Sequence, residues 1–132
     1  MSPLTRGLVG VVVAWLGLPA SAAGPDDAKG WWLTAARDAV IEFKACAEDG
    51  TALCGHIVWD RDAGTAHDTC GTQIARYARY ADQAWRDGWA FDPRDERKYR
   101  SVVRVQGDDM RLRAFVGTEL LGQTERLTRL GT

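Results

Sequence analysis

The sequence lacks a surplus of charge of either sign, because 17 lysines and arginines stand against 18 aspartates and glutamates. It also contains no internal repeat and no low-complexity tract. Four arginines do gather late in the chain, but they alternate with apolar residues, as on the solvated face of a strand: Arg111, Arg113, Arg126 and Arg129. Proteins that bind nucleic acids need a concentrated basic surface, so the charge balance argues against a nucleic-acid partner.

Residues with metal-binding or nucleophilic chemistry are scarce as well. The two histidines, His56 and His67, join Asp68 and Cys70 as the only soft or borderline metal ligands we single out. The acidic residues of this segment do not match the spacing of an EF-hand loop. Cys70 lies near His67 and Asp68, but neighbours on a loop do not define a catalytic triad. We therefore predict no catalytic residues, no metal and no cofactor.

Only one long apolar run occurs, and it lies at the start of the chain. Arg6 precedes the apolar segment Gly7–Leu18, Pro19 interrupts it, and Ala20-Ser21-Ala22 supplies the small residues of a cleavage site. The run is too short to cross a bilayer, which needs about 20 apolar residues. We predict a signal peptide over residues 1–22 and a periplasmic or secreted protein that does not span the membrane after cleavage.

The remaining chain has the size of a single domain. Removal of the leader leaves about 110 residues, enough to bury about two-thirds of the surface of the unfolded chain. Residues 23–29 are polar and contain a proline, so we expect a flexible lead-in there. The domain itself is predicted to cover residues 30–132.

Alternating apolar and polar residues dominate this domain. The pattern predicts short strands separated by turns, at residues 30–34, 39–45, 53–60, 85–92, 99–106, 110–116 and 120–130. Ile74–Ala84 is ambiguous, because its apolar residues recur at helical spacing and would, taken alone, form a short helix. Short strands without a long crossover indicate an antiparallel meander that closes into a small barrel.

Three cysteines are an odd number for an oxidising compartment. If Phe43 and Ala45 face the core, Cys46 faces outward, and on the returning strand Cys54 faces outward too. The two cysteines therefore share one face of a predicted hairpin, and we expect them to form a disulfide. Cys70 would then be free or bonded between chains, while three free thiols are the alternative.

Several segments together resemble a known family, the domain of unknown function 2147 family. The segments that carry the resemblance span the mature chain: Gly30–Thr34, Val40–Phe43, Leu53–Trp59, Cys70-Gly71, Trp85–Pro93, Lys98-Tyr99 and Leu120–Thr124. The resemblance implies an exported bacterial envelope protein with a lipocalin-like barrel of about eight strands, and it implies no established activity. We take its barrel strand over the local helix for Ile74–Ala84.

The aromatic residues are the candidate binding site. Five of the six tryptophans lie in the mature chain, and the predicted ligand-binding set is Trp59, Trp85, Trp89, Phe91 and Tyr99. These residues either fill the barrel interior or line a cavity that holds one small ligand. We also expect Trp59 and Trp89 to be buried, since both fall on the apolar register of alternating strands.

Three hypotheses about function follow. The leading one is a non-catalytic binding module for a small apolar or amphipathic ligand. The second is an envelope protein that contacts a protein partner and has a filled barrel. The third is an enzyme that uses loop residues near His67 and Cys70.

Overall fold

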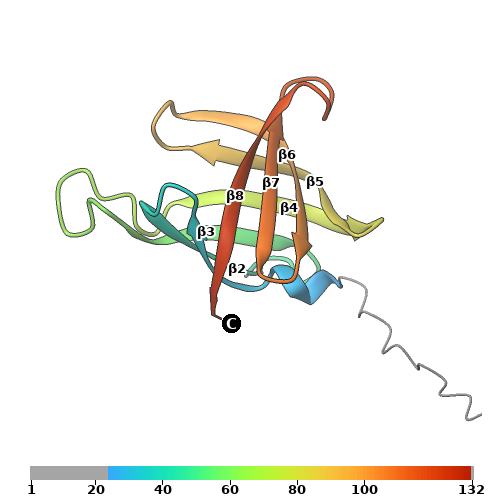
Figure 1. Ribbon diagram of the computed structural model, residues 1–132, viewed down its shortest axis with the longest axis horizontal. Helices are drawn as coiled ribbons and strands as arrows, with labels where there is room; N and C mark the ends of the chain where they lie inside the picture. Colours follow the sequence, from blue (N-terminus) through green and yellow to red (C-terminus); the bar gives the residue numbers. More distant parts are fainter. Residues whose placement is uncertain (1–23, 132) are drawn as a thin grey trace, which may run out of the picture.

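The computed structural model describes residues 24–131 and forms one closed antiparallel barrel of eight strands (Figure 1). Each strand pairs with its neighbour in sequence, and the last strand pairs with the first. The predictions of an all-β fold and of barrel closure are confirmed. The elements, in chain order, are η1 (Pro25–Ala28), β1 (Gly30–Thr34), β2 (Ala39–Ala45), β3 (Leu53–Asp60), β4 (Gln73–Ala81), β5 (Ala84–Asp92), β6 (Arg97–Gln106), β7 (Asp109–Phe115) and β8 (Gly122–Gly131). The predicted signal peptide lies outside the described residues.

The ambiguous segment is strand β4, as the resemblance implied. Its backbone pairs with both β3 and β5, and this pairing outweighs the helical spacing of its apolar residues. Tyr77 is fully buried, and its hydroxyl lies 2.8 Å from the Ser101 hydroxyl oxygen. Gly88 opposes Tyr77, and a Cβ atom there would lie 2.2 Å from the tyrosine ring. A glycine is therefore needed at position 88, where the Tyr77 ring packs against the backbone of β5.

One end of the barrel is closed by large side chains and by η1. The largest fully buried side chains include Trp32, Phe43, Leu53, Tyr77 and Met110. The indole Nε1 of Trp32 donates to the Ala28 carbonyl oxygen at 2.9 Å, and that of Trp85 donates to the Pro25 carbonyl oxygen at 3.1 Å. Buried indole groups need such acceptors.

The segment expected to be a flexible lead-in, residues 23–29, contains a short helix in the part that the structure describes. Pro25–Ala28 forms a 3-10 helix, and Ala28 is buried. The Arg129 guanidinium lies over the Trp32 ring, 4.3 Å from its centre, and also donates to the Lys29 carbonyl oxygen at 3.1 Å. Composition suggested disorder, but the carbonyl groups of this segment are the acceptors of buried donors.

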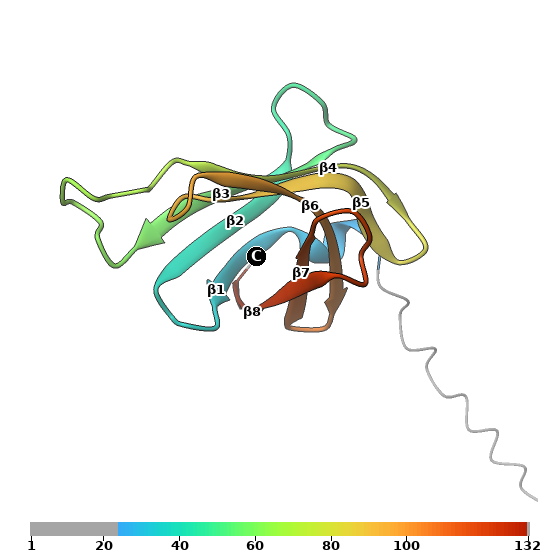
Figure 2. The same ribbon diagram turned by 90° about the horizontal axis from the view of Figure 1, so that it is seen from above.

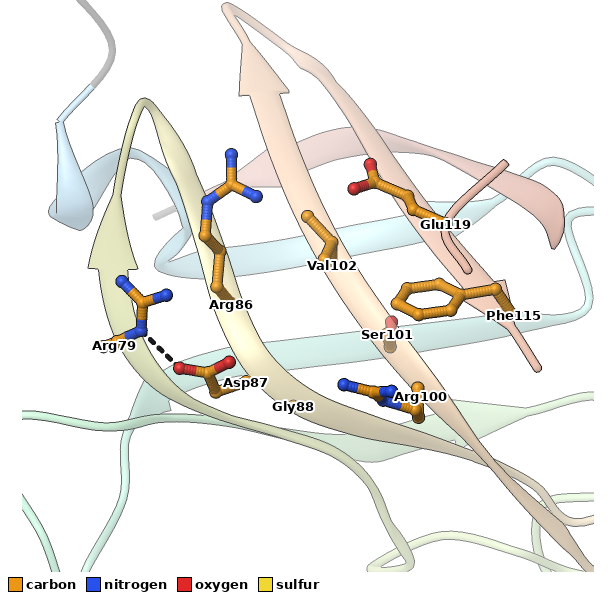
Figure 3. Close-up of a pocket in the computed structure, with 9 residues that line it drawn as sticks. All are labelled: Arg79, Arg86, Asp87, Gly88, Arg100, Ser101, Val102, Phe115 and Glu119. Atoms are coloured by element: carbon orange, nitrogen blue, oxygen red, sulfur yellow. Dashed lines mark hydrogen bonds and ion pairs between the residues drawn. The ribbon is translucent and has the colours of Figure 1, made fainter. Parts of the chain in front are cut away.

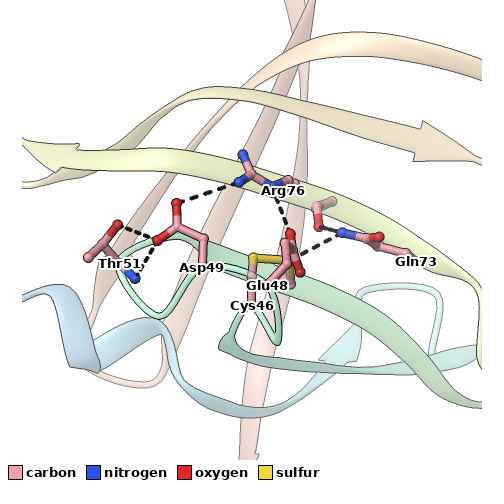
Figure 4. Close-up of polar contacts among 8 residues, drawn as sticks. Cys46, Glu48, Asp49, Thr51, Gln73 and Arg76 are labelled. Carbon is pink, nitrogen blue, oxygen red and sulfur yellow. Dashed lines mark hydrogen bonds and ion pairs between the residues drawn. A yellow bond between two sulfur atoms is a disulfide. The ribbon is translucent and has the colours of Figure 1, made fainter.

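The predicted disulfide between Cys46 and Cys54 is present at the β2–β3 hairpin (Figure 4). The two residues are not directly opposite, because Cys54 pairs with Lys44 and the Cys46 N–H donates to the Ala52 carbonyl. Both cysteines are nevertheless buried, since the hairpin loop covers them and Gln73 donates to the Cys54 sulfur at 3.2 Å. Cys70 is free and exposed.

The same hairpin is tied to β4 by charge. Arg76 places its Nε 3.2 Å from a Glu48 carboxylate oxygen and one Nη 3.7 Å from an Asp49 carboxylate oxygen (Figure 4). The hydrogen bonds of Glu48 with its own backbone and with Arg76 lower the pKa of that carboxyl. These contacts help to hold the loop against the barrel wall.

Two predicted core tryptophans lie on the outside, and β-bulges explain both errors. In β3, Val40 pairs with Trp59 while Ile41 pairs with Ile57, so Val58 is an extra residue and the alternation reverses. Trp59 is consequently 42% exposed, and Asp60 is buried in its place.

A second bulge in β5, where Asp87 has a φ of 54°, reverses the alternation in the same way. Trp85 therefore faces inward and is buried, whereas Trp89 is only half-buried and pairs with Arg76 and Arg100. The Lys98 ammonium lies 4.2 Å from the centre of the Trp89 ring. The predicted burial of Trp59 and Trp89 is wrong, because alternation without bulges assigns the opposite face.

Candidate functional site

The up-and-down topology gathers four connections at the end of the barrel opposite η1. They are residues 35–38, 61–72, 93–96 and 116–121. In Figure 1 the long β3–β4 loop and the β5–β6 turn project on the same side of the molecule. Figure 2 shows β1, β7 and β8 lying across the interior from β3 and β4. These connections form the rim of an open cavity of about 1500 Å³.

The floor of this cavity is apolar. Its buried aliphatic residues come from six of the eight strands, and they are Ile41, Ile57, Ile74, Ala90, Leu112 and Leu127. Inward positions at the closed end carry aromatic rings, whereas these positions carry smaller side chains, which leaves the space empty. The floor can bury apolar surface of a ligand at about 25 cal/mol per Å².

The rim is polar and carries its own hydrogen bonds. The Thr34 hydroxyl donates to the Asp38 carboxylate at 2.6 Å, and the Tyr99 hydroxyl donates to the Asp95 carboxylate at 2.8 Å. The latter bond raises the pKa of Tyr99. Arg94 donates through Nε and one Nη to Asp92 at 3.1 and 3.0 Å, which lowers the pKa of that carboxyl. The rim therefore has fixed polar groups around an apolar interior.

The structure divides the predicted aromatic set. Phe91 and Tyr99 line the cavity. Trp85 belongs to the closed end, where its ring packs edge-on against Tyr80 with the centres 5.6 Å apart. Trp59 and Trp89 lie on the outer face and do not line the cavity. The correction follows from the two bulges described above.

Sequence reasoning missed the aliphatic floor. Nothing in the alternating pattern distinguishes an inward residue beside a cavity, such as Ile57 or Leu112, from one within packed side chains. The signal that was available is size, since the floor of the cavity carries Ala, Ile and Leu, whereas the inward positions near η1 include Trp32, Phe43 and Tyr77.

The loop that carries His67 and Cys70 organises itself through carboxylates. Asp60 accepts hydrogen bonds from the N–H groups of Asp62 and Thr69 at 2.9 and 2.8 Å. Asp68 accepts from the N–H groups of Gly64 and Cys70, both at 2.8 Å. These are local turn interactions, and they occupy the carboxylate oxygens that a bound metal ion or substrate would otherwise contact.

Cys70 is poorly suited to nucleophilic chemistry in this arrangement. Its thiol hydrogen-bonds to Asp68, which raises the pKa of Cys70, while the same contact lowers the pKa of Asp68. The side-chain atoms of Asp60, Asp68 and Cys70 that could coordinate a metal ion lie within 4.8 Å of one another. Within residues 24–131, no histidine nitrogen joins this group at that distance, so a histidine–thiol pair is not assembled here.

A smaller pocket of about 360 Å³ lies on the wall formed by β4 to β7 (Figure 3). Three arginines line it, and each already has a partner within the protein. Arg79 forms an ion pair with Asp87, and Arg86 donates to the Ala81 carbonyl oxygen at 2.9 Å. Arg100 lies over the Phe115 ring, 5.8 Å from its centre. The cavity at the open end is therefore the stronger candidate site.

The comparisons with known proteins agree with the fold. A family model described as "Uncharacterized protein conserved in bacteria (DUF2147)" matches residues 30–129. Among curated proteins, none matches the sequence. Protein HP1028 from the human pathogen Helicobacter pylori, described as belonging to the lipocalin family, is similar in structure with a TM-score of 0.60. The two are 13% identical, and the similarity covers 78% of this chain and 82% of that chain, which supports a lipocalin-like barrel.

No helix among residues 24–131 has the length and apolar character needed to cross a bilayer.

Proposed function

The chain belongs to the DUF2147 family, and from this premise we propose that it is an exported module that binds a small apolar or amphipathic molecule. The observation that carries the proposal is the open cavity with an apolar floor and a polar rim. Its volume of about 1500 Å³ exceeds the roughly 300–1,000 Å³ typical of small-molecule sites. Eight-stranded barrels of this kind have room for one small ligand.

The β7–β8 connection supports the entry of an apolar chain. Val116 and Leu121 line the cavity and are exposed, and Leu120 beside them is 88% exposed. Exposed apolar residues that continue a cavity wall are typical of ligand entrances. The same residues are the specific observation that favours the second candidate function, contact with an envelope protein. That hypothesis assumed a filled barrel, so the open cavity favours the ligand.

A matched pair of substitutions tests the proposal. Ala114 lies in the cavity wall, and Ala114→Phe would fill space there, whereas Ala78→Phe adds the same ring on the exposed face of β4. Neutral N-phenyl-1-naphthylamine gains fluorescence in apolar sites and reports occupancy. We expect binding by the native protein and by Ala78→Phe, and at least a tenfold loss in Ala114→Phe. Equal binding by both variants would place the probe elsewhere and reject the proposal.

The hypothesis of an enzyme has less support, because the loop near His67 and Cys70 assembles no reactive pair. We propose a non-catalytic role for the protein on that basis. The predicted leader supports export to the periplasm or beyond. Fractionation of cells that express the full chain would test export, with a cytoplasmic product as the result against it.

A further inference from the structure

Strand β8 places a solvent-exposed carboxylate on the wall of the cavity. Glu125 pairs with Leu112 across β7 and β8, and two residues further along β8, Leu127 pairs with Met110. Residues opposite each other in an antiparallel pair project from the same face of the sheet. Glu125 therefore shares the inward face with buried Leu112 and Leu127, and it lines the cavity between them and the rim.

The basic group that interacts electrostatically with this carboxylate, Arg94, is held mainly by Asp92. Within residues 24–131, Glu125 accepts no hydrogen bond and forms no ion pair. Arg94 is the basic group whose pKa Glu125 helps to raise, but Asp92 makes the larger contribution and holds the guanidinium in two hydrogen bonds. Because Glu125 is exposed on the cavity wall, its charge is solvated and remains available to a cation that enters the cavity.

The rest of the cavity strengthens the negative field. The lining contains two arginines, Arg61 and Arg94, and Arg61 donates one Nη to the Ala36 carbonyl oxygen at 3.2 Å. Six carboxylates line the same cavity, which are Asp38, Asp60, Asp62, Asp92, Asp95 and Glu125. The whole chain has a net charge of only −1, so negative charge is concentrated at this mouth. A concave wall of one sign focuses the field and concentrates ligands of opposite charge.

We propose that the ligand is a cationic amphiphile whose ammonium group pairs with Glu125 while its hydrocarbon chain lies on the isoleucine and leucine floor. This inference rests on the proposed function and names the ligand class of the same cavity. An anionic amphiphile such as a fatty acid would bring its carboxylate next to Glu125 and the acidic rim. Like charges at that distance are unfavourable, so the two classes should be separated by affinity.

Three probes with one chain length measure the preference, namely dodecyltrimethylammonium, dodecanol and dodecanoate. Each is titrated below its micelle-forming concentration by displacement of N-phenyl-1-naphthylamine from the purified protein. We expect dodecyltrimethylammonium to bind about tenfold more tightly than dodecanoate, with dodecanol between them. Glu125→Gln should remove most of that preference and leave dodecanol affinity unchanged. Glu48→Gln removes the same charge in the β2–β3 loop at the closed end and should change nothing.

The outcomes separate this inference from the proposed function. Binding of all three probes with equal affinity would overturn the cation preference and leave the binding function in place. A preference that survives Glu125→Gln would also overturn it, because the charge responsible would lie elsewhere. If none of the three displaces the reporter and the reporter itself does not bind, the proposed function fails as well.

Discussion

The two ends of this barrel are built from the same eight strands but filled differently. At the closed end, Trp32, Phe43 and Tyr77 meet across the interior, and η1 covers them. At the open end, the same inward register carries smaller aliphatic side chains such as Ile57 and Leu112, which form the floor of an open cavity. The difference teaches that alternation determines which residues face inward, while side-chain volume determines whether the interior is packed.

The comparison predicts that a large side chain contributes more to stability at the closed end than an aliphatic one does at the open end. Trp32→Ala removes a fully buried ring and should lower the free energy of unfolding by about 3–5 kcal/mol. Leu112→Ala enlarges a space that is already open, so we expect about 2 kcal/mol, the low end for such changes. Denaturant unfolding measures both. A larger loss for Leu112→Ala would mean that the open end, not the closed end, holds the core.

The disulfide belongs to the closed end and should contribute less than Trp32. Replacing both Cys46 and Cys54 by serine should lower the free energy of unfolding by about 2.5 kcal/mol, as chain entropy predicts for so short a loop. Thiol counting of the native chain, denatured without reductant, should find one reactive thiol, that of Cys70. A count of three would contradict the disulfide.

An aromatic ring on the outer wall near the open end should matter little to stability. Trp59 is 42% exposed because of the bulge at Val58, so Trp59→Ala should cost less than about 1 kcal/mol. Comparison with Trp32→Ala under the same conditions tests the bulge directly. A loss for Trp59→Ala close to that for Trp32→Ala would show that the alternation is continuous and that Trp59 is inside.

The cysteine near the open end should react slowly for a thiol so exposed. Asp68 raises the pKa of Cys70, so the thiolate that reacts forms only at higher pH. Asp68→Ala should lower that pKa and shift the pH profile of alkylation by iodoacetamide to lower pH. Asp62→Ala, a change in the same loop, should leave the profile in place, and superimposable profiles for Asp68→Ala and the native chain would contradict the assignment.

Much of the fold could be predicted from local patterns. Strands β6 and β7 alternate without interruption, and the shared outward register of Cys46 and Cys54 predicted their disulfide. The faces of Trp59 and Trp89 could not be predicted, because a one-residue bulge has no clear mark in the sequence and reverses every later residue of the strand. In β5 the only trace is Asp87, a residue type that tolerates a positive φ.

The site was less accessible to sequence reasoning than the fold. Tyr99 and Phe91 were predicted to bind the ligand, and both line the cavity. The three predicted tryptophans do not, because one lies in the packed core and two lie on the outer face. Glu125 was missed although it lies in phase with Leu127, because a charged residue on an apolar register near a chain end reads as part of the solvated face. The role proposed for Glu125 depends on the cavity, and the cavity arises from packing between strands that are distant in the sequence.

Methyl spectroscopy tests the binding cavity most directly. The sequence contains three isoleucines, Ile41, Ile57 and Ile74, and all three line the floor of the cavity. Met110 is fully buried at the closed end and provides an internal control. In a titration with dodecanol, we expect the three isoleucine δ1-methyl signals to shift together and saturate while the Met110 methyl signal stays in place. Isoleucine signals that do not move, or a shift confined to Met110, would contradict the account.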